Sequence, residues 1–211
     1  RLHDTDNGAF LRKEDNMLCM AEDGVVTPFL AQKDVKLRGL HNIENLLAAA
    51  AAVWGEVPVE AIQKVGSTFT GVEHRIEPVR VLDGVTYYND SIGTSPTRTI
   101  AGLRSFDQKV ILIAGGYDKH IPYEPLAPED LVLMGATGPR IEKAVCEHPD
   151  FAASGLTIQH ADTMQHAVEL ARAAAQPGDI IILSPASASF DLYPNFEVRG
   201  REFKKIVNEL K

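Results

Sequence analysis

The stretch TMQHAVELARAAAQPGDIIILSPA, residues 163–186, decides the fold class. Its first half is predicted to be a helix, because apolar residues recur there at helical spacing. These residues are Met164, Ala167, Val168, Ala171 and Ala174. Thr163 can cap this helix, and Pro177–Gly178 ends it. The following run DIIILSPA is apolar on both faces, which is typical of a central strand in a parallel sheet.

The same alternation of strand and helix extends from about residue 69 to the end of the chain. Strands are predicted at 77–82, 85–89, 109–114, 131–135, 156–160 and 179–184. Helices are predicted at 95–106, 139–147, 163–175 and 196–210. Asp83–Gly84 favours a hairpin turn between the first two strands. The fold class is therefore α/β, with a Rossmann-like, mostly parallel sheet and helices on both faces.

The first part of the chain has a different pattern. Short apolar runs broken at Asp15–Asn16 and Asp23–Gly24 predict a β-meander within residues 1–40. Two helices are expected next, at 44–53 and 58–65, and Asn42 could serve as the N-cap of the first. The small, polar segment GSTFTG (66–71) is interpreted as an interdomain linker. Two domains are expected, at residues 1–68 and 69–211.

One predicted connection does not fit a regular crossover. A parallel crossover usually contains a helix, but Pro122, Pro125 and Pro128 lie between the strands at 109–114 and 131–135. Either this crossover is irregular, or residues are missing from the chain near Glu129–Asp130, and the second explanation is favoured.

Composition narrows the function classes. A net charge of −8 argues against a nucleic-acid partner, and no apolar run is long enough to span a bilayer. The chain starts at Arg1 without a leader, so we expect a piece of a longer cytoplasmic protein with no membrane partner. Cys19 and Cys146 are predicted to be buried free thiols. The seven histidines show no ligand spacing, so no metal site is predicted.

Small, hydroxyl or charged residues follow four of the predicted strands. The groups are Asn89–Asp90–Ser91 with Thr94, Gly115–Gly116 with Lys119, residues 135–138, and residues 184–191. Ligands bind outside the carboxyl ends of parallel strands, so these groups predict a site along one edge of the sheet. Helix capping by Ser95 and Pro96 explains only the start of the next helix. It leaves residues 89–91 in need of partners when buried.

Taken singly, several of these residues have plainer interpretations. Lys119 could be a solvated turn lysine, and His74–Arg75 could be a solvated basic pair. A P-loop, GxxxxGK[ST], is absent from the sequence. A dehydrogenase is disfavoured as well, because no GxGxxG follows a predicted strand.

Five segments together carry a family resemblance. They are GLHNIENLLAAAA (39–51), GVEHRIEPV (71–79), YYNDSIGTSPTRTIAGL (87–103), LIAGGYDK (112–119) and LSPASASFDLYPNFEVRGREFK (183–204). In combination they resemble the Mur ligase family, and most closely its D-glutamate-adding branch. The resemblance runs from about residue 39 to the end of the chain.

The resemblance implies an ATP-dependent acid–D-amino-acid ligase of peptidoglycan synthesis, and thus of cell-wall formation, cell shape and cell division. Such an enzyme joins D-glutamate to UDP-N-acetylmuramoyl-L-alanine through an acyl phosphate, using ATP and Mg²⁺. Residues 1–68 would then end a central ATP-binding domain, and 69–211 would form the C-terminal ligase domain. The P-loop and the Mg²⁺ ligands would lie upstream of Arg1, so the fragment is expected to be inactive alone. A monomer is expected.

Site residues follow from the same resemblance. Asn42 and Asn45 would meet the adenine, Arg75 the ATP phosphates and Asp90 the ribose. The catalytic group would be His74, Arg75 and Lys119. D-Glutamate would be surrounded by Thr94, Lys119, Ser189, Phe190 and Phe196. Ile92 departs from the family pattern, since many relatives carry lysine there, so a phosphate contact at that position is in doubt.

Two alternatives stay open at this stage. One is a non-catalytic binding or regulatory module on a Rossmann-like sheet. The other is a ligase of the same family that adds a different amino acid.

Overall fold

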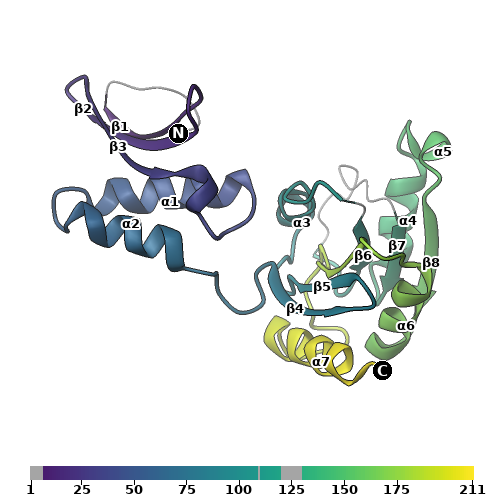
Figure 1. Cartoon of the computed structure of the whole chain (residues 1–211). Coiled ribbons are helices and arrows are strands. Elements are labelled where there is room, and N and C mark those ends of the chain that lie inside the picture. Colours follow the sequence, from purple (N-terminus) through teal and green to yellow (C-terminus); the bar gives the residue numbers. More distant parts are fainter. Residues whose placement is uncertain (1–6, 109, 120–129) are drawn as a thin grey trace. The chain divides into compact units, whose positions relative to one another are not determined.

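The computed structural model describes residues 7–108, 110–119 and 130–211. The chain divides into two compact units, Arg1–Gly71 and Val72–Lys211 (Figure 1). The predictions of an irregular crossover or of missing residues before Asp130 concern residues 120–129, which lie outside the described part of the chain.

The first unit begins with the predicted meander. Its three antiparallel strands, in the order β1-β2-β3, are β1 (Gly8–Arg12), β2 (Met17–Glu22) and β3 (Val25–Ala31). The helical elements that follow are η1 (Gln32–Asp34), α1 (Leu40–Val53) and α2 (Val59–Thr68). Leu18 and Phe29 of the sheet pack with Ile43, Leu47 and Ile62 of the helices in one apolar core.

The helix ends in this unit differ from the prediction. Helix α1 begins at Leu40 rather than Glu44, with Gly39 as its N-cap residue at φ 87°, so the N-cap interpretation of Asn42 is wrong. Helix α2 continues through Thr68, so the first half of the predicted linker is helical. The hydroxyls of Ser67 and Thr68 donate to helix carbonyls (2.8 and 2.6 Å), which stabilises them inside the last turn.

The second unit contains the predicted Rossmann-like sheet. Its strands are β4 (Glu77–Leu82), β5 (Val85–Asn89), β6 (Val110–Ala114), β7 (Asp130–Met134), β8 (Thr157–Ala161) and β9 (Ile180–Leu183). The sheet order is β4-β5-β9-β6-β7-β8. Only β4 runs antiparallel to its neighbour, through the predicted hairpin turn at Asp83–Gly84.

Strand β9 lies at the centre of this sheet, as its sequence predicted. Ile181 and Leu183 belong to the core on one face, and Ile180 and Ile182 to the core on the other. All four are buried. A strand with two apolar faces is stable only between two layers of helices, which explains the position of β9.

Helices cover both faces of the sheet (Figure 1). Their bounds are α3 (Pro96–Leu103), α4 (Gly138–Cys146), α5 (Phe151–Ser154), α6 (Met164–Ala174) and α7 (Phe196–Glu209). Helices α6 and α7 pack on one face, and α4 packs on the other. The predicted cap at Thr163 is confirmed, because its side chain accepts a hydrogen bond from the His166 N–H at 3.1 Å.

Three details correct the sequence predictions. Helix α3 ends at Leu103, and a tighter turn follows in which Phe106 N–H donates to Leu103 C=O (3.2 Å). Helix α5 was not predicted. Cys146 is exposed, not buried, because the buried positions of α4 include Ile141, Ala144 and Val145. Cys19 is buried as predicted, and neither cysteine forms a disulfide.

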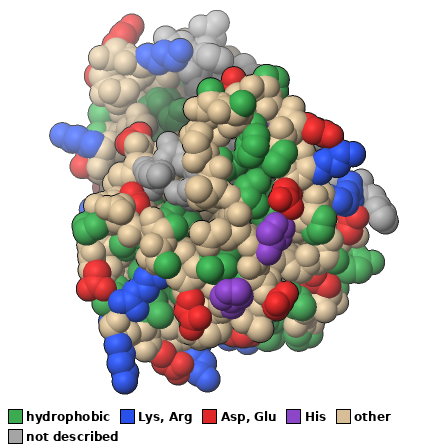
Figure 2. Space-filling model, turned by 90° about the vertical axis from the view of Figure 1, so that its right-hand side faces the viewer, with side chains coloured by type: hydrophobic (Ala, Val, Ile, Leu, Met, Phe, Trp, Pro, Cys, Tyr) green, Lys and Arg blue, Asp and Glu red, His purple; other side chains and the backbone are tan. Residues whose placement is uncertain are grey.

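Within the described part of the chain, no helix has the length and apolar character required to cross a membrane. Basic and acidic side chains lie interspersed on the face shown in Figure 2.

Candidate functional site

The four polar strand ends predicted to share one edge of the sheet do share it. Strands β5, β9, β6 and β7 are consecutive parallel neighbours, so the loops after Asn89, Leu183, Ala114 and Met134 leave the same edge. Backbone hydrogen bonds join these loops to one another. Gly115 N–H donates to Pro185 C=O (2.8 Å), and Tyr117 N–H donates to Ala188 C=O (2.9 Å).

The Gly115–Gly116 pair is required by this close approach. Both residues have positive φ, 114° and 148°. A Cβ on Gly115 would lie 1.8 Å from Met134 O, and one on Gly116 would lie 2.2 Å from Ala188 O. Thr137, in the loop after β7, joins the other two loops through its buried hydroxyl. This hydroxyl accepts from Gly116 N–H (2.9 Å) and bonds Ser187 Oγ (2.8 Å). Only glycine fits between these loops.

Asn89 is fully buried at the end of β5, and its amide is completely used. Its Nδ2 donates to His74 Nδ1 (2.8 Å) and Glu77 Oε2 (3.0 Å), while its Oδ1 accepts from Ser91 N–H (3.1 Å). Turning the amide over would bring its oxygen against Glu77 Oε2 and its NH2 group against Ser91 N–H, and would break both of those hydrogen bonds. Because His74 Nδ1 is the acceptor, the neutral ring carries its proton on Nε2.

Asp90 also lies beneath the surface, with 4% of its area exposed. One carboxylate oxygen accepts from Ile76 N–H (3.2 Å) and the other from Ser184 Oγ (2.6 Å). Burial raises the pKa of Asp90 to about 6, although these hydrogen bonds and the charges of Arg75 and Arg98 oppose the rise. The three short polar residues 89–91 therefore find the partners that burial demands, within the protein itself.

Arg75 sits in a strained turn between His74 and Ile76. Both neighbours have left-handed backbones, with φ 67° and 45°, a conformation that a β-branched residue such as Ile76 rarely adopts. His74 N–H donates to Glu77 Oε2 (3.0 Å), and His74 C=O accepts from Ile92 N–H (3.2 Å). The backbone around Arg75 is thus fixed while its side chain remains exposed. The interpretation of His74 as part of a solvated pair is wrong, since only 3% of it is exposed.

Glu73, His74 and Glu77 place potential metal-ligand atoms within 4.8 Å of one another. The ammonium of Lys204, however, already bonds Glu73 Oε1 (3.2 Å) and Glu77 Oε1. With Nδ1 accepting from Asn89, the proton of the neutral His74 ring lies on Nε2, which has no hydrogen-bond partner among the described residues and lies 3.6 Å from Glu73 Oε1. Burial acts to raise the pKa of Glu77, but hydrogen bonds from His74, Lys204 and Asn89 hold it below its usual value. This cluster is built around an ammonium group and does not suit a metal ion.

The residues expected around an amino-acid substrate all lie at this edge. Lys119 is exposed on the loop after β6, and Thr94 is half-buried before α3. Ser189 is buried on the loop after β9, whereas 66% of Phe190 is exposed, with its ring 6.1 Å from that of Tyr117. Phe196 begins α7 and lies edge-on to the His74 ring at 5.9 Å.

Asn42 and Asn45 belong to the other unit, in the first turns of α1. Asn42 is buried, and its Nδ2 donates to Arg38 C=O at 2.7 Å. Asn45 Nδ2 donates to Asn42 Oδ1 at 3.4 Å.

The site contains one residue that the sequence reasoning missed, Arg199. It is 2% exposed and bonds both the 89–91 and the 187–188 segments. A signal was present, because Arg199 occupies the apolar stripe of α7 with Phe203, Ile206 and Val207. A charged residue at helical spacing among core residues demands a specific partner.

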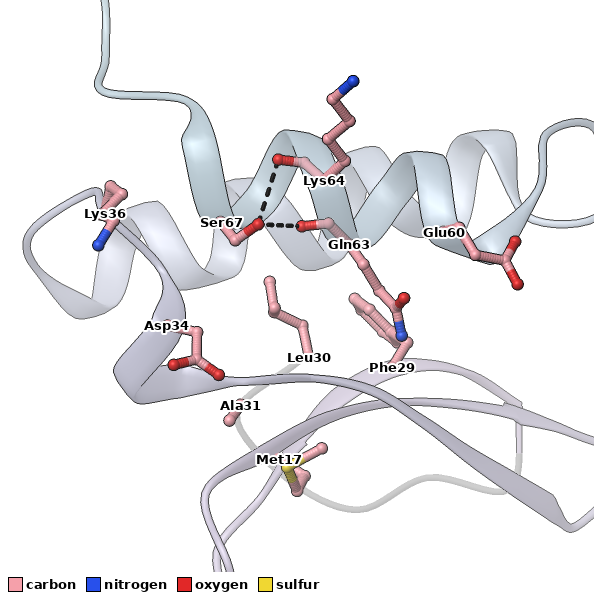
Figure 3. Close-up of a pocket in the computed structure, with 10 residues that line it drawn as sticks. All are labelled: Met17, Phe29, Leu30, Ala31, Asp34, Lys36, Glu60, Gln63, Lys64 and Ser67. Atoms are coloured by element: carbon pink, nitrogen blue, oxygen red, sulfur yellow. Dashed lines mark hydrogen bonds between the residues drawn. The ribbon is translucent and has the colours of Figure 1, made fainter.

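A pocket of about 730 Å³ opens in the first unit, between β3, η1 and α2 (Figure 3). Apolar residues such as Phe29 and Leu30 line it together with Asp34, Lys36, Glu60 and Lys64. None of the residues predicted for substrate binding lines this pocket.

Residues 74–187 match the family described as "Mur ligase, glutamate ligase domain". The chain is 50% identical over 216 residues to the UDP-N-acetylmuramoylalanine--D-glutamate ligase of Clostridium novyi, covering 100% of this chain and 46% of that protein. It is 50% identical over 213 residues to the protein of the same name from Acetivibrio thermocellus, covering 97% and 45%. The chain thus spans about half the length of the curated relatives it matches.

Among solved structures, a pseudomurein peptide ligase type C from Methanothermus fervidus superposes with a TM-score of 0.64. It is 14% identical, over 99% of this chain and 43% of that one, so the likeness concerns the fold. The fold and the strand-end site define a Rossmann-like domain of the kind that ends such ligases. The chain belongs to the Mur ligase family.

Proposed function

We propose that the full-length protein containing this chain adds D-glutamate to UDP-N-acetylmuramoyl-L-alanine in peptidoglycan synthesis. The observation that carries the proposal is 50% identity over the whole chain to a protein named for that reaction. The residues that the resemblance assigns to D-glutamate also meet at one edge of the second unit. The enzyme would act in the cytoplasm as a monomer, on small molecules and without nucleic acid or a membrane.

In this proposal, residues 1–68 end a central ATP-binding domain and residues 69–211 form the C-terminal ligase domain. The P-loop and the Mg²⁺ ligands belong to the part of the protein upstream of this chain. When bound there, Mg²⁺ would neutralise charge on the ATP phosphates.

The reaction is activation of a carboxylate followed by attack of an amine. The substrate carboxylate takes the γ-phosphoryl group of ATP, and ADP leaves. The D-glutamate amine then forms the amide bond to the acyl carbon and loses a proton to solvent, while phosphate leaves with the electron pair of the broken C–O bond. Water competes for the acyl phosphate, so the amine must be held in position and water excluded. Positioning of this kind is worth roughly 7–11 kcal/mol of the barrier.

Each site residue has a role in this scheme. Lys119 pairs with a D-glutamate carboxylate, and Thr94, Ser189, Phe190 and Phe196 surround the same substrate. Arg75 reaches the ATP phosphates.

The other expected residues contact ATP or hold the turn that carries Arg75. Asn42 and Asn45 meet the adenine, and Asp90 the ribose. His74 holds the turn that carries Arg75, a role supported by its burial and by its bond to Asn89. Asp90 would meet the ribose with an oxygen that already accepts one hydrogen bond.

The test is ATP-dependent phosphate release by the full-length protein with UDP-N-acetylmuramoyl-L-alanine. D-Glutamate is compared with L-lysine, meso-diaminopimelate and L-alanine as acceptors. We expect release with D-glutamate alone, and its loss in Lys119→Ala. Lys143→Ala is the matched control, because Lys143 is an exposed lysine on α4 whose ammonium lies 3.8 Å from the exposed Glu147 carboxylate.

Two other outcomes would count against the proposal. Release with a different amino acid would indicate another member of the family. No release with any acceptor would favour a binding module without turnover.

A further inference from the structure

Arg199 is a buried cation in the first turns of α7. Its guanidinium makes four hydrogen bonds. Nε donates to Ser91 Oγ (3.0 Å) and Nη2 to Ser91 C=O (2.8 Å), while Nη1 donates to Ser187 C=O (3.2 Å) and Ala188 C=O (3.1 Å). The planar fork of arginine therefore fixes the distance between two loops.

The two loops follow β5 and β9, and further contacts extend the connection. Ser91 Oγ also donates to Phe196 C=O (2.7 Å), and Ala188 C=O also accepts from Tyr117 N–H (2.9 Å). Arg199 thus holds the backbone immediately before Ser189 and Phe190, and through Ser91 it holds Phe196. These are three of the residues assigned above to the amino-acid substrate.

None of the four acceptors of Arg199 is a carboxylate. Serine and peptide oxygens satisfy its N–H groups but carry no charge, so the negative charge of Asp191 acts on Arg199 without a direct hydrogen bond. Burial lowers the pKa of Arg199 to about 10, with Asp191 and Tyr193 opposing the change. A ligand anion held on the 187–190 loop would add to the negative charge that Asp191 already supplies near Arg199.

We infer that Arg199 is a positioning residue for an anionic amino acid: it sets the 187–190 loop and adds positive potential beneath it. This inference rests on the proposed function and deepens it, because it explains why the acceptor would be a dicarboxylic amino acid. Arg199 itself is buried and makes no contact with the substrate. Lys119 provides the exposed cation on the rim, and Arg199 the buried one below it.

Arg80 provides a matched control. It also donates three hydrogen bonds to backbone carbonyls at the C-terminal end of α7, at Val207 (3.1 Å), Asn208 (3.1 Å) and the C-cap residue Leu210 (2.9 Å). These carbonyls lie at the opposite end of the helix from Arg199. Removing Arg80 therefore weakens the same helix without touching the strand-end loops.

The experiment compares Arg199→Ala, Arg199→Lys and Arg80→Ala in the full-length protein. We expect the KM for D-glutamate to rise about 10- to 100-fold in Arg199→Ala, with the KM values for ATP and the nucleotide substrate nearly unchanged. Methylguanidine added at millimolar concentration should restore part of the D-glutamate affinity of this variant. Arg80→Ala should lower Tm and leave all three KM values unchanged.

Arg199→Lys keeps the charge but removes the fork, so its KM for D-glutamate should rise less than that of Arg199→Ala. If Arg199→Ala does not fold, Arg199→Lys carries the test. Equal KM changes for all three substrates, or none in a folded variant, would overturn the inference while leaving the proposed function intact. A wild-type protein without D-glutamate-dependent phosphate release would overturn both.

Discussion

At the scale of single residues, the site depends on the buried side chains of Asn89 and Asp90, each of which has several hydrogen-bond partners. Asn89 uses both amide protons and its oxygen, and both oxygens of Asp90 accept hydrogen bonds. These bonds hold the turn on which Arg75 is presented. Hydrogen bonding of this kind selects one conformation of Asn89 and Asp90, because rotation of either side chain would break these bonds.

Asp90→Asn should change the pH dependence of stability. The pKa of Asp90 rises on folding from 3.8 to about 6, so the folded state binds this proton more tightly than the unfolded state. Its stabilising contribution is complete below pH 3.8 and is lost as the pH rises through 6. Above pH 6 the wild-type fold is less stable than it is with Asp90 protonated, by roughly 3 kcal/mol. Asparagine does not ionise, so the variant does not lose this stability.

The measurement is urea unfolding of this chain at pH 4.5 and pH 7. The free energy of unfolding of Asp90→Asn, taken relative to wild type, should increase between these two values. Asp107→Asn is the control, since it removes an exposed carboxyl. An equal pH-dependent difference in both variants would show that Asp90 is not the group responsible.

At the scale of elements, helix α7 links several parts of the site. Phe196 begins it, Arg199 holds two loops, Gly200 faces His74, and Lys204 neutralises Glu73 and Glu77. These residues share one face of a single helix because they lie three or four positions apart. The same spacing places Lys204 beside Glu73 and Glu77. Partial burial acts to lower the pKa of Lys204, but the two carboxylates raise it above its usual value.

Gly200→Ala tests how closely α7 packs on the site. Alanine normally stabilises a helix relative to glycine by about 0.5–1 kcal/mol. At this position its Cβ would lie 2.3 Å from His74 Nδ1 and 3.0 Å from Asn89 Oδ1, both in buried side chains. We therefore expect destabilisation of about 1–3 kcal/mol instead.

Thermal or urea unfolding decides this sign. Arg201→Ala is the control on the same helix, because its side chain is 61% exposed, and a change within about 0.5 kcal/mol is expected. A stabilised Gly200→Ala would mean that the helix can move away from His74.

At the scale of the whole molecule, the chain consists of two compact units with separate cores, divided at Gly71/Val72. The residues proposed for the nucleotide base lie in the first unit, and those proposed for D-glutamate in the second. An activity that needs both therefore requires more than either unit provides.

The 211-residue chain alone should release no phosphate from ATP above background, with both substrates present. No stretch of its sequence matches the P-loop pattern GxxxxGK[ST], whose backbone N–H groups hold nucleotide phosphates. The full-length protein, assayed beside it, is the positive control. Turnover by the isolated chain would contradict the proposal that the phosphate site lies upstream.

The sequence alone determined the α/β class, the central position of β9 and the edge on which the polar loops meet. These features follow from local periodicity and from the rule that ligands bind at the carboxyl ends of parallel strands. The sequence did not determine the roles of single residues. Ser95 does occupy the N-cap position, but its side chain makes no capping bond, and Asn42 is no cap at all.

Only the tertiary structure showed that His74 is buried, that Asn89 fixes its proton, and that Arg199 joins two loops more than ninety residues apart in sequence. A hydrogen bond between residues far apart in sequence produces no periodic sequence pattern in either segment, so it cannot be predicted from the spacing of apolar residues. Its formation depends on where packing of the sheet and of α7 brings the two segments, to within a fraction of an ångström. The local pattern therefore specified the elements and their order, and the packing between them decided which polar groups meet.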